Sequence, residues 1–230
     1  GGGNHFIELQ RGDDGFIWLM IHSGSRNVGK QVADHYNHVA KRLREKYAAV
    51  PAAFDLAHLP LGSKEADAYL AEMEYCLNFA QCNRDLMMEE VMRIVHEHTR
   101  ATFGKPINIH HNFARAEVHY GERVMVHRKG ATSAEAGQMG IIPGSQGAAS
   151  YIVRGKGNRE SFCSCSHGAG RRMGRRQAER ELDLALERAR LESRGIIHSL
   201  RTRHDLDEAA GAYKDIEQVM ADQADLVEHV

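Results

Sequence analysis

The spacing of apolar residues divides the first part of the chain into two strands and two helices. The apolar run FIWLMIHSG at 16–24 ends in serine and glycine and predicts a buried strand, while the GGGNHFIEL start predicts a glycine turn entering another strand. Apolar residues then recur every three or four positions over 26–48 and from about 65 to 102, which is typical of amphipathic helices. Pro51 and Pro60 stand between these helices, so we expect a turn region there.

The pattern changes between residues 106 and 165. Four stretches there alternate or are β-rich, and glycine-bearing turns separate them: INIHHNFARAEVHY, ERVMVHRKG, ASYIVRG and SFCSCS. Helical spacing returns at about 170–190 and again at 213–228. The sequence contains no internal repeat and no low-complexity linker. We therefore predict one mixed α+β domain over residues 1–230, with a central β-sheet core and surrounding helices.

The composition is that of an ordinary globular protein. Of the 230 residues, 42% are hydrophobic and 27% are charged, and no apolar run approaches the length of a membrane span. The four cysteines show neither CxxC pairing nor the spacing of a secreted disulfide framework, so we expect a reducing, cytoplasmic location. Cys163 and Cys165 could be metal ligands, but a strand with alternate small side chains on one face explains them better.

Basic residues cluster locally although the formal net charge is only −1 at pH 7. The clusters are Arg123, Arg128 and Lys129; Arg154, Lys156 and Arg159; and Arg171, Arg172, Arg175 and Arg176. Such clusters are more often solvated surface than binding sites, so charge alone leaves an anionic partner open without favouring it.

The segment GSRNVGKQ at 24–31 has only part of the pattern of a phosphate-binding P-loop. It follows a predicted strand and opens a predicted helix, with Gly24, Gly29 and Lys30 suitably spaced. Gln31, however, stands where a P-loop needs a Ser or Thr hydroxyl for Mg²⁺. No later hydrophobic run ends in the Asp of a second metal-binding element, so the sequence argues against a P-loop NTPase.

Histidine is abundant, with 15 residues, and several histidines stand where a strand meets a turn. His5 follows the glycine-rich start, His22 ends an apolar strand, and His111 lies in IHHNF. A single histidine at such a place is usually structural, but imidazoles on rigid strand ends are also good ligands for Mn²⁺, Zn²⁺ or Fe²⁺. His167, between a small-residue run and a glycine turn, could be a packed core residue, a metal ligand or a nucleophile.

Two glycine-rich segments have the composition of anion-binding loops. They are IIPGSQGAAS at 141–150 and SHGAGRRMGRR at 166–176. Because glycine adopts positive φ readily, successive backbone N–H groups can face a phosphate there, and a helix starting nearby would add its positive end. A plain turn is the alternative for the first segment. Together with the metal-capable histidines, the two segments suggest phosphoryl chemistry.

Six blocks of the sequence occur in a recognisable order: GGGNHFIE, HSGSR, HHNFARAE, HRKGATSAEAGQMGIIPGSQGAASYIVRG, SFCSCSHGAGR and AYKDIEQVM. This ordered set resembles the RtcB-type RNA-splicing ligases over essentially the whole chain. The resemblance implies an RtcB-like fold and a ligase that uses GTP and two Mn²⁺ ions. Its partner would be RNA, with a 2′,3′-cyclic phosphate or 3′-phosphate at one end and a 5′-hydroxyl at the other, and no membrane would be involved.

The resemblance assigns the central role to His167. This residue matches the nucleophile that attacks the α-phosphate of GTP, forms a guanylyl-histidine and releases pyrophosphate. The RNA 3′-phosphate would then take the GMP, and the 5′-hydroxyl would displace it to leave a 3′,5′-phosphodiester. His110 and His127 have weaker claims to a role and are interpreted as structural.

The remaining site residues also follow from the resemblance. His5 matches a ligand of one manganese ion, and His22 and His111 match ligands of the other. The residues that match the guanylate pocket are Asn4, Phe6, Glu8, Ser145, Ser150, Ala169 and Gly170, of which Glu8 would accept from the guanine edge. The residues that match phosphate-holding positions near the RNA ends are Arg26, Lys129 and Arg175.

Two features of the family are missing from these 230 residues. The family carries an upstream Asp-x-Gly-Cys stretch that completes the metal site and a C-terminal Lys that contacts the guanine nucleotide. None of the cysteines here stands in the first context. We therefore expect a fragment that is weak or inactive by itself, from a parent protein that is active. A metal-dependent phosphoesterase acting on cyclic phosphates and a non-catalytic module that binds RNA ends or nucleotides stay open as alternatives.

Overall fold

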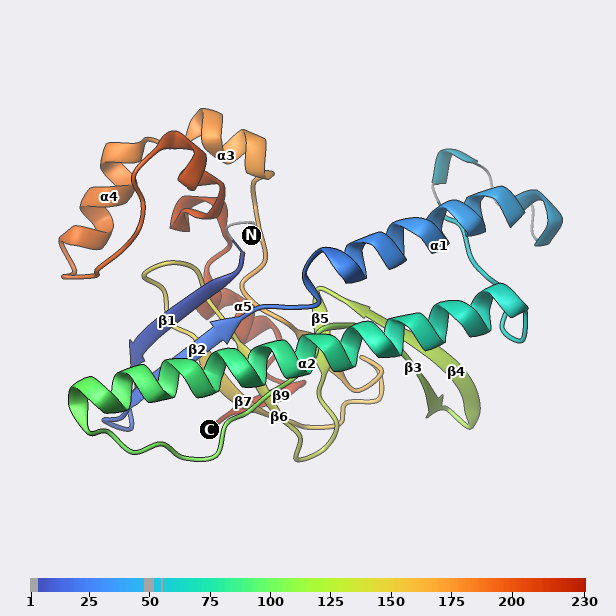
Figure 1. Cartoon of the computed structure of the whole chain (residues 1–230), viewed down its shortest axis with the longest axis horizontal. Helices are drawn as coiled ribbons and strands as arrows, with labels where there is room; N and C mark the ends of the chain where they lie inside the picture. Colours follow the sequence, from blue (N-terminus) through green and yellow to red (C-terminus); the bar gives the residue numbers. More distant parts are fainter. Residues whose placement is uncertain (1–3, 48–51, 55) are drawn as a thin grey trace. The chain divides into compact units, whose positions relative to one another are not determined.

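The chain forms two compact units, the first ending at Asn108 and the second beginning at Ile109. The computed structural model describes residues 4–47, 52–54 and 56–230 (Figure 1). The glycine turn expected at residues 1–3 and the expected turn residue Pro51 lie outside the described residues. Whether both units act as one catalytic domain stays a prediction.

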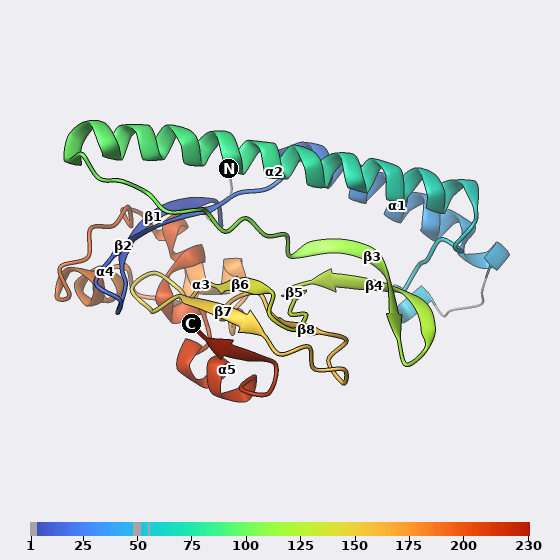
Figure 2. The ribbon, with the colours of Figure 1, turned by 90° about the horizontal axis from the view of Figure 1, so that it is seen from below.

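The first unit contains a β-hairpin and two long helices. Its elements are β1 (Phe6–Arg11), β2 (Ile17–His22), α1 (Arg26–Tyr47), the 3₁₀ turn η1 (Ala52–Phe54) and α2 (Lys64–Thr99). β1 and β2 are antiparallel neighbours. α1 and α2 lie side by side and run in opposite directions (Figure 1 and Figure 2). The strand and helices predicted for this part are thereby confirmed, although the start of β2 is not buried, since Ile17 is 65% exposed.

Both ends of α2 are fixed by local backbone chemistry. The Ser63 side chain accepts a hydrogen bond from the Ala66 N–H at 3.1 Å, and Glu65 and Asp67 place negative charge in the first turn. At the other end Arg100 adopts the left-handed conformation, with φ of 60°, and its N–H caps the His96 carbonyl. The apolar pattern between these caps therefore forms one unbroken helix of 36 residues.

The buried side chain of Tyr36 joins α1 to α2. Tyr36 is 7% exposed, and its ring centroid lies 5.2 Å from that of Tyr69. Its hydroxyl donates a 2.8 Å hydrogen bond to Glu72 Oε1. This bond, burial and the negative charge of Glu72 raise the pKa of Tyr36 above its ordinary value, so the hydroxyl keeps its proton.

The second unit is built from short strands followed by short helices. Its strands are β3 (Asn112–His119), β4 (Glu122–Lys129), β5 (Ala131–Ser133), β6 (Met139–Ile142), β7 (Tyr151–Gly155), β8 (Ser164–Ser166) and β9 (Val227–His229). Its helical segments are α3 (Arg175–Glu181), α4 (Leu184–Glu192), η2 (Arg203–Glu208), η3 (Ala210–Ala212) and α5 (Ile216–Asp222). The strands pair as β3-β4, β5-β8 and β6-β7-β9, each pair antiparallel (Figure 2).

The mixed α+β class is confirmed, but the arrangement of strands differs from the expected central sheet. The described residues form four small antiparallel sheets, of which the largest has three strands. Glycine turns with positive φ join successive strands, as at Gly121 between β3 and β4 and at Gly130 between β4 and β5, with φ of 86° and 72°. Several strands of this unit are very short, with three residues in β5, β8 and β9 and four in β6, so their ladders stay small.

The C-terminal part corrects one helix prediction. The helix expected over 213–228 ends at Asp222, and Val227 starts strand β9 instead. Val227 is 3% exposed in a core that contains Ile142, Val153 and Ile216, and its backbone pairs with Gly155 in β7. Burial against this core and pairing with the neighbouring strand override the local helical spacing.

The helical pattern expected over 170–190 is confirmed as two helices rather than one. Asp183 separates α3 from α4, and its side chain accepts from the Leu186 N–H at 2.9 Å as an N-cap. Among the residues that the structure describes, no helix is long and apolar enough to cross a membrane.

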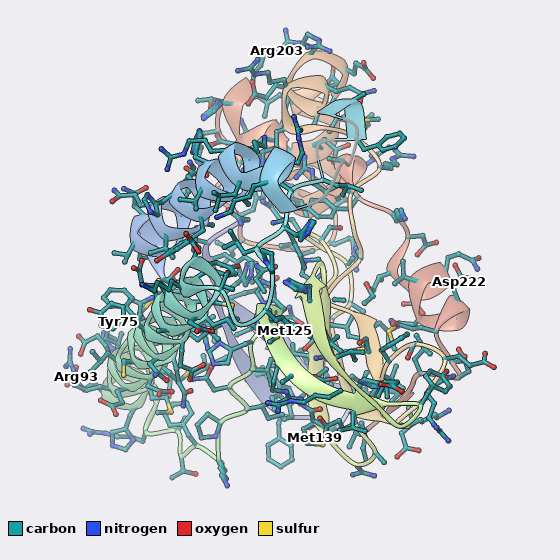
Figure 3. All side chains as sticks on the ribbon, turned by 90° about the vertical axis from the view of Figure 1, so that its right-hand side faces the viewer. Tyr75, Arg93, Met125, Met139, Arg203 and Asp222 are labelled. Atoms are coloured by element: carbon teal, nitrogen blue, oxygen red, sulfur yellow. The ribbon has the colours of Figure 1, made fainter. Side chains whose placement is uncertain are left out.

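We predict that Tyr36→Phe lowers the free energy of unfolding by about 1 kcal/mol, because it removes one hydrogen bond to a carboxylate and leaves the packing unchanged. Tyr75→Phe is the matched control, since Tyr75 projects from α2 and is 65% exposed (Figure 3). Urea unfolding followed by circular dichroism measures both. Equal midpoints for the two variants would contradict the proposed contribution of the Tyr36–Glu72 contact.

Candidate functional site

Strand pairing places the candidate nucleophile His167 beside a glycine turn. His167 follows β8 directly, and β8 pairs with β5 so that Ser166 stands opposite Ala131. Gly130, which precedes Ala131, hydrogen-bonds through its backbone to the His167 ring. A Cβ added to Gly130 would lie 3.7 Å from His167 Cε1, so the imidazole ring lies close to this glycine. The side chain is half-buried, which excludes the interpretation of His167 as a fully packed core residue.

The surroundings of His167 favour its neutral form. Burial lowers the pKa of this imidazole, the hydrogen bond to Gly130 raises it in part, and the nearby charge of Lys129 lowers it further. The net effect is a pKa below the ordinary value of 6.5. A neutral ring has a nitrogen lone pair at pH 7, which a nucleophile and a metal ligand both require.

A second predicted site histidine lies beside His167 in the same unit. The ring centroids of His111 and His167 are 5.2 Å apart, with the rings tilted by 33°. His111 comes immediately before β3, so it stands at a strand end as the sequence predicts. The structure therefore brings together these two of the predicted functional residues.

The first unit brings together another pair. The rings of His5 and His22 are stacked, with centroids 6.2 Å apart and planes at 19°. This follows from the hairpin register, in which Phe6 stands opposite His22. His22 Nδ1 hydrogen-bonds to the Asn4 carbonyl oxygen. Because a carbonyl only accepts, Nδ1 donates this bond, and in the neutral ring the lone pair is then on Nε2.

These histidine pairs fit the donor chemistry of a metal site, but the full ligand set is not assembled within one unit. His5 and His22 belong to the first unit and His111 to the second. Across residues 4–47, 52–54 and 56–230, no group of three or more His, Cys, Asp or Glu side chains is arranged to hold a metal ion. The three-histidine metal site therefore stays a prediction.

The residues expected in the guanylate pocket are also divided between the units. Asn4, Phe6 and Glu8 lie in the first, and Phe6 and Glu8 are alternate residues of β1, so they share one face of the hairpin. Burial raises the pKa of Glu8 above its ordinary value, although a 2.8 Å hydrogen bond from Gln10 partly opposes this.

The guanylate-pocket residues of the second unit lie in two loops that contact each other. Ser145 and Ser150 belong to the loop between β6 and β7, and Ala169 donates its N–H to the Pro143 carbonyl at 3.0 Å. Gly168 packs closely here, because a Cβ on it would come within 3.1 Å of the same oxygen. The sequence blocks around 141–150 and 166–170 are therefore neighbours in space.

Several backbone donors of these loops already have acceptors. Gly144 N–H reaches Ser150 Oγ at 3.3 Å, Ala148 N–H reaches the Ser145 carbonyl at 2.9 Å, and Gly168 N–H reaches Ser166 Oγ at 3.4 Å. A phosphate bound here would therefore depend on the other donors of the loops and on basic side chains.

The expected phosphate-binding residues have different surroundings. Arg26 opens α1 with a positive φ of 56°. Lys129 ends β4 next to Gly130, so it lies close to His167. Arg175 opens α3, and its Nη2 lies 2.9 Å from Glu208 Oε1 in an ion pair.

The basic cluster of Arg123, Arg128 and Lys129 was expected to be solvated surface, and for Arg128 this expectation is wrong. It is 2% exposed and makes a two-pronged ion pair with Glu117, with Nη1–Oε1 at 2.5 Å and Nη2–Oε2 at 3.0 Å. Its Nε also donates to Ser164 Oγ and its Nη2 to the Phe162 carbonyl, each at 3.0 Å. His119 Nε2 lies 2.9 Å from Oε2 of the same carboxylate.

The sequence patterns do not point to the carboxylates Glu117 and Glu208. The sequence signal for Glu117 is the alternation in β3, where the polar residues Arg115, Glu117 and His119 are separated by single apolar residues. In the structure Glu117 and His119 point inward while Val118 is 71% exposed, the reverse of an ordinary half-buried strand.

The chain is similar to known ligases along its whole length. A sequence profile described as "RtcB: tRNA-splicing ligase RtcB" matches residues 1–230. The RNA-splicing ligase RtcB of Escherichia coli (strain K12) is 43% identical over 236 residues, which cover 99% of this chain and 57% of that protein. The RNA-splicing ligase RtcB of Mycobacterium tuberculosis is 34% identical over 253 residues, covering 96% and 58%. The tRNA-splicing ligase RtcB of Pyrococcus horikoshii is 34% identical over 260 residues, covering 96% and 30%. The chain thus spans a little over half the length of the Escherichia coli and Mycobacterium tuberculosis proteins and about a third of the Pyrococcus horikoshii protein.

We predict that Glu117→Gln lowers the free energy of unfolding of the second unit by about 3 kcal/mol, because it leaves the buried Arg128 charge without its anion. Glu97→Gln is the matched control: Glu97 forms a 2.5 Å surface ion pair with Arg93 on α2, labelled in Figure 3, and its loss should cost no more than about 0.5 kcal/mol. Guanidinium unfolding measures both changes. A loss for Glu117→Gln as small as that of the control would refute the structural importance of the buried pair.

The same pair predicts a pH dependence of stability. Burial by itself raises the pKa of Glu117, but hydrogen bonds from Arg128 and His119 and the arginine charges outweigh it and lower the pKa to about 2. The pKa of a glutamate in the unfolded chain is about 4.3. The ion pair therefore contributes fully to the free energy of unfolding above that pH, and this contribution is lost as the pH falls toward 2. The stability difference between the wild type and Glu117→Gln should therefore shrink over this range in acid unfolding series. A difference that stays constant would contradict an ionised Glu117.

Proposed function

Because this chain belongs to the RtcB tRNA-splicing ligase family, we propose that it carries the nucleophile and most of the substrate-binding residues of an RNA ligase. The ligase joins an RNA end with a 2′,3′-cyclic phosphate or 3′-phosphate to an RNA end with a 5′-hydroxyl, using GTP and Mn²⁺. The observation that carries this proposal is the position of His167, half-buried, with a lowered pKa, beside Gly130 and His111. A cytoplasmic location, expected from the cysteine pattern, is part of the proposal.

In this mechanism His167 acts as the attacking group. Its neutral ring nitrogen forms a bond to the α-phosphorus of GTP, and the bond from that phosphorus to pyrophosphate breaks, which gives guanylyl-histidine. The hydrogen bond to Gly130 occupies one ring nitrogen, so the other nitrogen would be the attacking atom. An oxygen of the RNA 3′-phosphate then displaces His167 and takes the GMP. Attack by the 5′-hydroxyl on this activated phosphate releases GMP and forms the phosphodiester; a cyclic phosphate must first be opened by water.

The predicted metal ligands fit a divalent cation in one respect that the structure describes. The bond from His22 Nδ1 to the Asn4 carbonyl leaves Nε2 as the ligand atom, which is the usual arrangement of a metal-bound histidine. His5, His22 and His111 would hold Mn²⁺, which would supply positive charge against the phosphates. Lys129 and the arginines of this chain would offset the remaining negative charge.

Guanine selection is assigned to the first unit. Glu8 shares a strand face with Phe6. A carboxylate there accepts hydrogen bonds from the N–H donors on the Watson–Crick edge of guanine. Adenine has no N–H on the corresponding ring nitrogen, so it would bind less well. The nucleotide would also contact Asn4 and the four pocket residues of the second unit: Ser145, Ser150, Ala169 and Gly170.

Labelling with radioactive GTP and Mn²⁺ tests the proposal. We expect a protein adduct that is stable to alkali, labile to acid and lost in His167→Ala, because a phosphorus–nitrogen bond has these properties. His127→Ala is the control and should keep the label, since the exposed His127 ring hydrogen-bonds to the Met125 carbonyl of its own strand. We expect weak labelling of the 230 residues alone and strong labelling once an upstream segment with the Asp-x-Gly-Cys stretch is supplied.

Three outcomes would overturn parts of this proposal. A label that survives His167→Ala would refute the nucleophile assignment. Release of phosphate from cyclic-phosphate RNA without GTP would instead support a phosphoesterase. RNA binding with no adduct in the extended protein would support a non-catalytic module.

A further inference from the structure

One carboxylate in the second unit joins two arginines of the basic segment that follows His167. Glu208 ends η2 and its side chain is only 8% exposed. Its Oε1 lies 2.9 Å from Arg175 Nη2, and its Oε2 lies 3.2 Å from Arg171 Nη1. The hydroxyl of Tyr213 also donates a hydrogen bond to Oε2. The carboxylate therefore accepts one hydrogen bond, from Tyr213 to Oε2, and has an arginine nitrogen at ion-pair distance from each oxygen; the contact of the buried Oε1 with Arg175 is an ion pair without hydrogen-bond geometry.

The two arginines differ in what else they contact. Arg171 donates through Nε to the Met173 carbonyl at 3.0 Å and through Nη2 to the Asp207 carbonyl, and its guanidinium lies 5.0 Å from the centroid of the Tyr213 ring. Its side chain is 24% exposed. Each nitrogen of this guanidinium thus has a protein partner, so Arg171 serves the local structure.

Arg175 keeps donors that face solvent. Its side chain is 48% exposed, and its contacts are the ion pair with Glu208 and a longer approach of Nε to Asp207 Oδ2 at 3.9 Å. A guanidinium has five N–H donors in a rigid fork, so one edge can be held by a carboxylate while another edge binds a phosphate. An arginine held in this way loses less side-chain freedom when it binds.

We propose that Glu208 is a positioning residue, whose buried carboxylate orients Arg175 so that its outer edge binds a phosphate of the RNA. The inference rests on the proposed function, which assigns Arg175 to the RNA ends. Glu208 itself touches no substrate. Its anion also offsets the repulsion between two guanidinium groups that converge on one point, which an uncharged side chain would not do.

The salt dependence of RNA binding distinguishes positioning from a general structural role. Each phosphate contact that is lost makes the slope of log affinity against log salt shallower by about 0.7 for single-stranded RNA, whereas a general loss of stability leaves the slope unchanged. The measurement uses the 230-residue chain and a labelled single-stranded RNA with a 3′-phosphate, without GTP or metal. We expect Glu208→Gln and Arg175→Gln each to weaken binding about tenfold at low salt and to reduce the slope by about 0.7.

The double variant and a matched control complete the test. Glu208→Gln combined with Arg175→Gln should weaken binding no further than Arg175→Gln alone, because both changes remove one contact. Glu187→Gln is the control: Glu187 is a buried carboxylate of the same unit, paired with Arg190 at 2.7 Å, and its variant should leave the slope unchanged. An unchanged slope in Glu208→Gln, additive losses in the double variant, or no RNA binding by the unmodified chain would each overturn the proposal.

A further variant covers the case in which Glu208→Gln does not fold. Glu208→Asp keeps the charge but withdraws the carboxylate by one methylene, so it should also reduce the slope, and an unchanged slope would overturn the proposal. The result is independent of catalysis, since no adduct at His167 is needed for it. Failure of the labelling experiment and failure of this inference are therefore separate outcomes.

Discussion

The buried ion pair between Arg128 and Glu117 is the interaction on which the arrangement around His167 depends. The same guanidinium bonds the Phe162 carbonyl and Ser164 Oγ, at the point where the chain enters β8. Phe162 and Cys163 both have positive φ, 54° and 47°, a conformation that costs energy in residues with a side chain. The contacts of Arg128 hold this strained turn in place. The strand that follows then carries His167 to Gly130, only two residues beyond Arg128 in the chain.

A buried ion pair is a costly way to gain stability, since removing two charges from water offsets much of their attraction. An apolar pair could fill the same volume. It could not, however, satisfy a carboxylate, a carbonyl and a hydroxyl at the same time, as the planar fork of Arg128 does. The contacts of Arg128 therefore tie the carboxylate of β3 to the turn before β8, which favours the direction in which β8 leaves that turn.

The secondary structure near the N-terminus was predictable from local patterns because local spacing and caps decide it. The spacing of apolar residues predicted α1 and α2, and Ser63 and Arg100 mark the ends of α2. Burial was less predictable, since the apolar residues at the start of β2 face solvent. Near the C-terminus, pairing of β9 with β7 decided the structure, and no local pattern reveals such a pairing before the fold is known.

The candidate site was predictable to a different extent. Strand-end histidines were recognisable in the sequence, and resemblance gave them roles, but the pairings His5–His22 and His111–His167 emerge only from register and loop contacts. The carboxylates were missed because an ion pair joins residues from different elements, which composition does not reveal. In the sequence, Arg128, Arg171 and Arg175 are all members of basic clusters, and nothing distinguishes them. Their acidic partners separate them: Arg128 is buried, Arg171 is occupied by the protein, and Arg175 still presents charge to solvent. The location of acidic side chains thus decides which members of a basic cluster are available to a phosphate.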